Sequence, residues 1–450
     1  MSETVTIYDV HDNKEGPVAY SDLIRLFDDY GGAAWFSSMV EGSGNLLPEN
    51  KARRAVFLND ADKQGERLLL LKDLEAWADV LQADTGADDM ADYCLSKAEE
   101  QSQVLRENLL KVIHVAKPIE VSYRGLAQFF ENAENNQVSN VSFINCTTEQ
   151  LKDLDAPRFF DYISEELRRN FDRIDLRNNY SLLVLPGYLG PNAIIEKWAK
   201  AAYENKAIII TDFEDFDDVD DVLEVFDAAG MAGGDVYRSS VLMCCNWLVG
   251  RGRLDAAGEE HDLYLPPSMA LAGKIYVGLL SQVAAGKRFG IIDGAEGVKF
   301  PLKKSEVSVL ERMGLVPMFG EYGKVMAFSA KTLFNGANLG LQIYSVVRVF
   351  DYVTKVLMDF LNRRAFENFN ANIRKELMGQ IVKFLDGISG NGRLIEDFNI
   401  QRFEQDALQK DKIHLNIHLK PYFPAKNFMI KMAGQKDEEG ARWDTAYDQQ

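Results

Sequence analysis

The sequence predicts an α/β fold with a mixed, mostly parallel sheet flanked by helices, followed by an α+β segment near the C-terminal end. Two observations support this fold class. Short apolar runs alternate with amphipathic helical patterns between residues 119 and 330, which is typical of βαβ units and of a parallel sheet covered on both faces. Two amphipathic helical patterns then lead into alternating strands between residues 345 and 433.

Length and composition are those of a soluble globular protein. The chain has 450 residues, of which 46% are hydrophobic and 26% charged, and its 11% of aromatic residues argue against disorder. The formal net charge of −19 opposes general binding to nucleic-acid phosphates. We therefore expect no nucleic-acid partner.

Targeting and cysteine signals favour the cytoplasm. No run of about 18 uncharged apolar residues is present, so no membrane insertion is expected. The N-terminal residues Met1–Ile7 lack the basic region and the apolar stretch of a signal peptide. The 4 cysteines include no CxxC pair, which fits a reducing compartment.

Residues 1–50 are predicted to form an N-terminal arm. The run Thr4–Val10 alternates in the manner of a strand but stands alone, so it needs a sheet in its own chain or in another. A short amphipathic helix is expected after it, marked by Leu23, Ile24 and Phe27.

Residues 51–118 are predicted to be a helical connector. Apolar residues recur at helical spacing along one face, at Leu68, Leu71, Leu74, Trp77 and Leu81. Because proline cannot continue a helix without losing a hydrogen bond, Pro118 is expected to end it.

Residues 119–344 are predicted to be an α/β body. The expected strands are Ser139–Asn145, Tyr180–Pro186, Ala207–Thr211 and Ser239–Val249, and the expected helices are Pro191–Glu204 and Asp217–Ala229. Leu315–Phe319 and Lys324–Ser329 are expected to pair as a hairpin. Cys244 and Cys245 fall within a strand of the buried type, so their side chains should pack in the core on opposite faces.

Residues 345–433 are predicted to be a separate α+β segment, and residues 434–450 a flexible tail. The segment carries 14 Lys+Arg against 10 Asp+Glu, a net charge of +4, so the total of −19 leaves −23 on the rest of the chain. Its helices are expected at Val346–Leu361 and Ile373–Ile388, and its strands at Ile400–Phe403, Lys412–Leu419 and Asn427–Met432. The last two strands are expected to pair as a proline-flanked hairpin.

Two groups of metal-ligating residue types are better explained without a metal. The run Asp212–Asp221 is rich in acids but lacks the glycine of a cation-binding loop, and acids are favourable at the start of a helix. His414 and His418 would lie about 13 Å apart on a strand, which is too far for one ion. We expect a solvated helix start and surface histidines.

The sequence contains no recognisable catalytic motif. There is no GxSxG, HExxH or CxxC pattern, and the turn Leu185–Gly187 lacks the glycine spacing of a phosphate-binding loop. We therefore expect a protein that is not an enzyme and that needs no cofactor or metal. The alternative from another class is a nucleotide-binding α/β enzyme that uses the units between Tyr180 and Val249.

The C-terminal segment resembles the C-terminal domain of contractile tail sheath proteins. Tyr344–Lys355 looks like the long helix of that domain, Asn391–Arg393 like the turn after its second helix, and His414–Lys431 like its closing strands. Three upstream motifs resemble the large sheath subunit of the type VI secretion system (TssC/VipB-like), namely Tyr123–Leu126, Val141–Asp153 and Leu265–Gly273. The resemblance covers roughly residues 60–433.

This resemblance implies a structural subunit of a contractile injection sheath, in which residues 345–433 form a tail-sheath-like assembly domain with inter-subunit strand exchange. The subunit would polymerise with a small sheath subunit (TssB/VipA-like) and with further copies of itself around an inner tube of Hcp-like protein, and contract to propel the tube. A baseplate and an AAA+ disassembly ATPase are further partners that the family implies. The alternative in the same class is a single-chain contractile phage or bacteriocin tail sheath.

The resemblance also implies which residues link the subunits. The strand donor is expected at Thr4, Val5, Thr6, Ile7, Tyr8 and Val10, unless this strand pairs within its own chain. The strand acceptor hairpin is expected at Ile413, Leu415, Ile417, Leu419, Phe428 and Ile430. Charge contacts with the tube or a subunit are expected among Lys355, Arg363, Arg364, Arg374 and Lys375, unless the basic character of the segment is coincidental.

Overall fold

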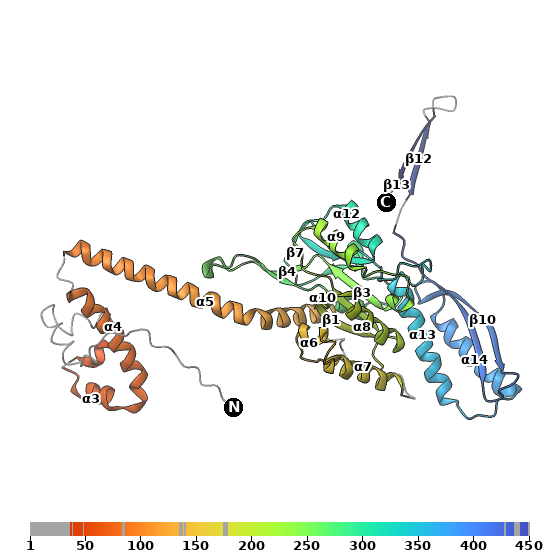
Figure 1. The fold of residues 1–450 in the computed structure, drawn as a ribbon, viewed down its shortest axis with the longest axis horizontal. Coiled ribbons are helices and arrows are strands. Elements are labelled where there is room, and N and C mark those ends of the chain that lie inside the picture. Colours follow the sequence, from red (N-terminus) through yellow and green to blue (C-terminus); the bar gives the residue numbers. More distant parts are fainter. Residues whose placement is uncertain are drawn as a thin grey trace. The chain divides into compact units, whose positions relative to one another are not determined.

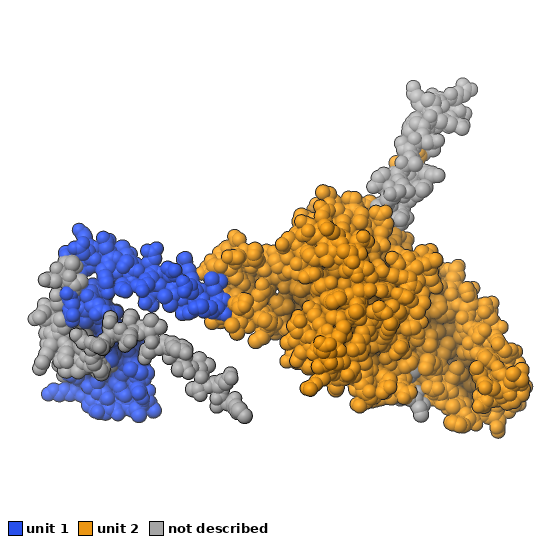
Figure 2. Space-filling view, in the orientation of Figure 1, with its two compact units in different colours: residues 1–111 blue, residues 112–450 orange. Residues whose placement is uncertain are grey.

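A computed structural model describes most of the chain and divides it into two compact units, residues 1–111 and residues 112–450 (Figure 2). The described residues are 37, 39–47, 49–82, 86–134, 138, 141–173, 179–426, 429–435 and 442–448. The predicted donor strand Thr4–Val10 and the predicted helix around Leu23, Ile24 and Phe27 lie outside the described residues.

The first unit is helical, as the sequence predicts. Its elements are η1 (Ser43–Leu46), α3 (Lys51–Asn59), η2 (Ala61–Lys63), α4 (Gln64–Gln82) and the first part of α5 (Ala87–Asn132) (Figure 1). A small core forms around Phe57, Leu70, Leu74 and Ala78. The buried face of α4 therefore includes Leu74 but not Leu68, which is exposed.

Helix α5 continues through Pro118, where the sequence predicts a stop. Proline in a helix interior costs about 3 kcal/mol, so other contacts must hold the following turns in place. The Ser122 hydroxyl donates to the carbonyl of Pro118 at 2.9 Å. Further along, Phe129 packs in the core, and Asn132 is buried and donates to the carbonyl of Asp293. Tertiary packing beyond the proline thus overrides the local signal.

The second unit is built on a six-stranded sheet with the order β1-β2-β3-β8-β9-β6. The strands β1 (Leu182–Tyr188), β2 (Ile208–Asp212), β3 (Val241–Cys245) and β8 (Leu315–Glu321) are parallel. Strand β9 (Lys324–Ala327) is antiparallel to both of its neighbours, β8 and β6 (Ile291–Ile292). The mostly parallel sheet and the β8–β9 hairpin confirm the predicted fold class.

Helices cover both faces of this sheet. They are α6 (Thr148–Lys152), α7 (Arg158–Phe171), α8 (Asn192–Glu204), α9 (Val219–Ala229), η4 (Val236–Ser240), α10 (Ser268–Val277), α11 (Gly286–Phe289) and α12 (Lys304–Met313), whereas η5 (Asp255–Ala257) lies in the connection between β4 and β5. Cys244 packs with Leu271 of α10 on one face, and Cys245 packs with Trp198 of α8 and Leu310 of α12 on the other. The prediction that the two cysteines face opposite sides of the core is confirmed.

Two predicted strands differ from the structure. The run Ser239–Val249 is broken at Asn246, whose backbone has a φ of 63°. The Asn246 side chain donates to the carbonyls of Phe300 and Met318, which fixes the break. The chain then enters a second sheet of β5 (Leu263–Leu265), β4 (Leu248–Arg251) and β7 (Gly297–Val298). Within the predicted strand Ser139–Asn145, the described residues 141–145 have no regular structure.

The C-terminal segment contains the two predicted helices, α13 (Tyr344–Arg363) and α14 (Ala371–Ile388). Its strands pair differently from the prediction: β11 (Ile413–Pro421) pairs with β10 (Ile395–Gln405), and β12 (Met429–Gln435) pairs with β13 (Arg442–Asp448). The predicted hairpin between Lys412–Leu419 and Asn427–Met432 is therefore wrong. The prediction of a flexible tail at residues 434–450 is wrong for β13.

The turn between β10 and β11 explains this difference. The side chain of Asp406 accepts hydrogen bonds from the backbone nitrogens of Leu408 and Gln409, which forms a tight turn without glycine or proline. The proline-flanked stretch expected to turn is instead held by the Tyr422 hydroxyl, which donates to the carbonyl of Gly390. Within the described part of the chain, no helix has the length and apolar character needed to cross a bilayer.

Candidate assembly surfaces

Helix α5 carries an apolar stripe with the 3-4 spacing of a coiled coil. We call the residues of this stripe the α5 seam: Leu95, Ala98, Ser102, Leu105, Leu109, Val112, Ala116, Ile119 and Tyr123. All nine residues are exposed, with exposed fractions of 68% for Leu105 and 72% for Ile119. Such spacing places one continuous seam on a helix, which normally packs against a second helix. The sequence prediction missed this seam, although its spacing is visible in the residues alone.

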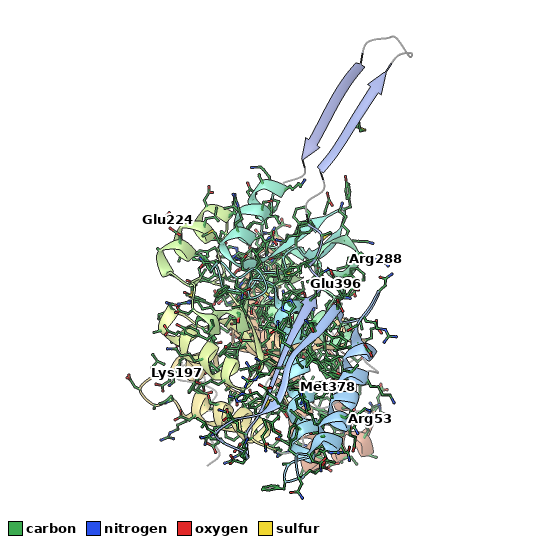
Figure 3. The ribbon with its side chains drawn as sticks, turned by 90° about the vertical axis from the view of Figure 1, so that its right-hand side faces the viewer. Arg53, Lys197, Glu224, Arg288, Met378 and Glu396 are labelled. Carbon is green, nitrogen blue, oxygen red and sulfur yellow. The ribbon has the colours of Figure 1, made fainter. Side chains whose placement is uncertain are left out.

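The β10–β11 ribbon presents open sheet edges. It packs on α14 through Phe403 and Leu419, and Figure 3 shows Glu396 on the ribbon and Met378 on the helix behind it. Among the described strands, β10 and β11 pair only with each other, so each keeps one edge of unpaired backbone groups. Unpaired edges accept an additional strand from another chain.

The residues predicted to form one acceptor hairpin are divided between two sheets. Ile413, Leu415, Ile417 and Leu419 lie on β11. Leu419 is buried in the cluster with α14, Leu415 and Ile417 are partly buried against it, and Ile413 is exposed. Ile430 lies on β12, opposite Tyr447 of β13, and Phe428 is outside the described residues. Only the β11 part of the predicted set therefore borders the free edge of the β10–β11 ribbon.

Lys355 is engaged inside the chain rather than at the surface. Its Nζ donates to the carbonyl of Tyr180 at 2.8 Å, and burial lowers the pKa of this amine to about 8. Burial also raises the pKa of Asp351, one turn earlier, to about 6, and Lys206 lies 3.8 Å from that carboxylate. These contacts tie α13 to the α/β body, so Lys355 is poorly placed for a partner.

Of the other four predicted basic residues, two form ion pairs and two do not within the described part of the chain. Arg363 is paired with Asp359, and Arg364 is paired with both Glu367 and Glu376. The remaining two, Arg374 and Lys375, are exposed on α14 and have no ion-pair partner in the part of the chain that the structure describes. The structure therefore leaves these two charges available to another molecule.

The carboxyl end of the parallel sheet is filled by the side chain of Asp212. Its Oδ1 accepts from the backbone nitrogen of Ser268 at 2.8 Å, and its Oδ2 accepts from the Ser268 hydroxyl at 2.6 Å and from the Gly187 nitrogen at 2.8 Å. Burial raises the pKa of Asp212 to about 7. Backbone donors at this edge and at a helix start are those that a nucleotide phosphate would use. In this chain they already hold a carboxylate.

The sequence predicts that the whole acidic run is solvated, and the structure differs from this prediction. Asp212 is fully buried, whereas Asp218 is the N-cap of α9 and accepts from the backbone nitrogen of Asp221 at 3.0 Å. The predicted solvated, acidic helix start is confirmed at α9, where the N-cap Asp218 and the first-turn residues Asp220 and Asp221 are exposed, and it is wrong for Asp212. His414 and His418 lie on β11 as predicted, and the ring of His414 lies 2.7 Å from the Asp406 carboxylate.

Solved structures with a detectable likeness belong to contractile tails. One is the anti-feeding prophage baseplate, with 13% identity over 67% of this chain and 77% of that chain and a TM-score of 0.45. Another is the helical sheath of the same prophage in its contracted state, with 15% identity, coverages of 64% and 74%, and a TM-score of 0.41. A sheath tail protein from Desulfitobacterium hafniense shares 11% identity, with coverages of 57% and 60% and a TM-score of 0.34. No curated protein sequence matches.

Three family models match consecutive parts of the chain. The model described as "TssC/VipB-like, N-terminal region" matches residues 22–109. "Type VI secretion system TssC/VipB, central domain" matches residues 111–335, which is half of the chain, and "TssC/VipB-like, C-terminal domain" matches residues 343–449. The matches extend from the first helices through the sheet body to the last strands.

Proposed function

Since the chain belongs to the TssC/VipB family, and is a structural sheath subunit of a contractile injection system, we propose that it polymerises with a small sheath subunit around an inner tube and contracts to propel that tube. The observation that carries this proposal is the exposed α5 seam. An apolar stripe with this spacing is typical of a helix that packs against a partner helix. We propose that this partner helix belongs to a second protein, the small sheath subunit.

The α5 seam supports a helical partner segment in the small subunit. Full burial of a leucine side chain contributes roughly 2 kcal/mol, and the seam contains Leu95, Leu105, Leu109, Val112 and Ile119. Such a gain exceeds the cost of association only when several of these residues are buried together. We propose that the small subunit supplies a helix that covers them in register.

Strand addition at the β10–β11 ribbon supports the link between successive subunits. We propose that the segment Thr4–Val10 of a neighbouring copy, or a strand of the small subunit, extends this ribbon at one of its free edges. About six backbone hydrogen bonds at roughly 1 kcal/mol each would contribute on the order of 6 kcal/mol per link. Pairing of Thr4–Val10 within its own chain is the alternative.

Arg374 and Lys375 support a charge contact with the inner tube or with a neighbouring subunit. We propose this role for these two residues because Arg363 and Arg364 form ion pairs and the half-buried Lys355 donates to a carbonyl, so that within the described part of the chain only Arg374 and Lys375 are unpaired among the five candidates. In a sheath, exposed charges of this kind set register and permit release better than apolar contacts. A tube of Hcp-like rings, a baseplate and an AAA+ disassembly ATPase complete the proposed set of partners.

We further propose that the chain acts in the cytoplasm and is not an enzyme. The engaged donors around Asp212 support the second point, because nucleotide binding at the sheet edge would have to displace a fully buried carboxylate. Tight binding in a nucleotide titration of the full chain would contradict it.

Co-expression with and without the small sheath subunit tests the proposed function. We expect negative-stain microscopy to show tubes with a central bore only when both proteins are present. The chain alone should remain unassembled or insoluble because its α5 seam is uncovered. Tubes formed by the chain alone would instead indicate a single-chain tail sheath of the phage or bacteriocin type.

A further inference from the structure

Arg348 on α13 is a buried cation for which no ion-pair partner is found among the described residues. Its exposed fraction is 7%, and its Nε and Nη1 atoms have no hydrogen-bond acceptor among the described residues. Burial lowers the pKa of the guanidinium to about 10. The ionisable group that faces it is the hydroxyl of Tyr344, one turn earlier, which already accepts from the backbone nitrogen of Ala284 at 2.6 Å.

A second buried arginine, by contrast, has hydrogen-bond acceptors for its guanidinium within the chain. Arg238 has an exposed fraction of 6%, close to that of Arg348. Its nitrogens reach the Asp235 carboxylate, the side-chain oxygen of Asn192 at 3.1 Å and the carbonyl of Met231. An ion buried without such partners carries a desolvation penalty of several kcal/mol. Arg348 therefore stands out as a site that lacks its acceptor.

The surroundings of Arg348 on α13 also point to a missing acceptor from outside. Ser345, on the same side of the helix, has a buried hydroxyl without a hydrogen-bond partner in the described part of the chain. Tyr352, one turn after Arg348, has an exposed fraction of 37%, so this side of the helix reaches the surface. A segment seated over Tyr352 would lie about one helical turn from the guanidinium.

We propose that Arg348 is an inter-subunit anion site, occupied in the assembled sheath by a carboxylate from a second copy of this chain. Charge complementarity supports a second copy, because residues 345–433 carry +4 and the rest of each chain carries −23. A guanidinium donates charge-assisted hydrogen bonds to a carboxylate, and the described residues supply no acceptor for the Nε and Nη1 atoms of Arg348. This inference rests on the proposed function, because it needs copies of the chain to meet.

The site would favour assembly in a specific way. The isolated chain bears the cost of an unpaired buried charge, and the arriving carboxylate removes that cost. The ion pair therefore contributes to assembly even though the same arginine destabilises the free chain.

Matched substitutions of the two buried arginines test the proposal. Arg348→Met should leave the unfolding temperature of the full chain unchanged or raised, because methionine removes an unpaired charge and fills similar space. Arg238→Met should lower the unfolding temperature, because it leaves Asp235 and Asn192 without their partner. If Arg348→Met lowers it as Arg238→Met does, or prevents folding, the acceptor lies within the chain and the proposal is wrong.

Assembly with the small subunit gives the second measurement. At equal protein concentration, we expect Arg348→Met to reduce the yield of sedimentable tubes at least about tenfold, the equivalent of 1.4 kcal/mol per contact, and Arg348→Lys to retain part of it. If wild type and Arg348→Met form tubes in equal yield, this inference is wrong but the proposed function is not affected. Failure of the wild-type pair to form tubes would overturn the proposed function, and with it this inference.

The source of the carboxylate can be identified by photo-crosslinking. A chain in which the exposed Tyr352 is replaced by benzoylphenylalanine should, in assembled tubes, crosslink to a second copy of the chain. A crosslink formed only with the small subunit would contradict the assignment to a second copy.

Discussion

Ser268 donates two hydrogen bonds to the carboxylate of Asp212, from its backbone nitrogen at 2.8 Å and from its hydroxyl at 2.6 Å. The contact joins the last residue of β2 to the first residue of α10, which lie 56 positions apart in the sequence. It thereby holds the start of α10 against the carboxyl edge of the sheet. A buried group that connects distant elements in this way should matter for stability.

Asp212→Asn should destabilise the chain by about 3 kcal/mol, because it places an NH₂ donor among three donors inside the core. Ser268→Ala, which leaves the carboxylate with two backbone donors, should cost only about 1 kcal/mol. Urea unfolding of both full-length variants at about pH 4, where the contribution of Asp212 is fully present, measures the difference. Equal stability of wild type and Asp212→Asn would mean that the carboxylate is not the feature that holds this edge together.

The stability contributed by Asp212 should depend on pH with a definite sign. Because burial raises its pKa from 3.8 to about 7, the folded chain retains a proton that the unfolded chain releases between these values. This contribution is fully present below about pH 4 and is lost as the pH rises toward 7. We expect the difference in unfolding free energy between wild type and Asp212→Asn to fall by up to roughly 4 kcal/mol over that window.

The pH dependence of the wild type must be compared with that of Asp212→Asn because two other groups have shifted pKa values in the same pH range. Burial raises the pKa of Asp351 to about 6 and lowers that of Lys355 to about 8. Both groups are present in wild type and variant, so their contributions cancel. A stability difference that rises with pH would show that the three donors outweigh burial and favour the charged carboxylate.

The sheet body could be predicted from sequence because its signals are local. The run Ile208–Asp212 is continuously apolar up to its last residues, as expected for a strand buried on both faces, and the helical period of α8 is contained within its own 13 residues. Ile209 and Ile210 pack in different cores, on opposite faces of the sheet. This alternation can be predicted without information from distant residues. The same holds for the opposite faces taken by Cys244 and Cys245.

The features that sequence analysis missed depend on distant contacts. The burial of Asp212 requires hydrogen-bond donors from Gly187 and Ser268. The acidic run itself contains no information about these distant donors. The pairing of β11 with β10 depends on which edge lies nearer in the folded chain, since alternation within a strand does not specify its neighbour. Lys355 appears in a basic segment, but its direction is set by the carbonyl of Tyr180, far away in the sequence.

Reversing the two unpaired charges on α14 should weaken binding of the sheath to its charged partner. We expect Arg374→Glu combined with Lys375→Glu to reduce co-sedimentation of the sheath with tube protein, and we expect wild-type binding itself to weaken at high salt. Lys383 is also exposed on α14, and at nine residues after Arg374 it lies on the opposite side of the helix from that arginine. Lys383→Glu should bind as wild type, whereas an equal effect of both changes would indicate a general charge effect.

Polar residues in the α5 seam should abolish binding of the small subunit without unfolding the chain. Leu105 and Leu109 are exposed, with fractions of 68% and 41%, and neither belongs to a hydrophobic core cluster, so Leu105→Gln combined with Leu109→Gln should leave the fold of the chain intact. If each leucine is buried by the partner helix at about 2 kcal/mol, the pair is worth roughly 4 kcal/mol, or about a thousandfold in affinity. A pull-down of the co-expressed small subunit measures the loss.

Val104 provides the matched control for this prediction. It is also apolar and exposed, with a fraction of 45%, but it lies outside the 3-4 spacing of the α5 seam. Val104→Gln should therefore bind the small subunit as wild type does, and circular dichroism should show unchanged helix content in both variants. If Val104→Gln weakens binding as much as the double change, α5 is recognised as a generally apolar surface, and the coiled-coil register proposed for the α5 seam is incorrect.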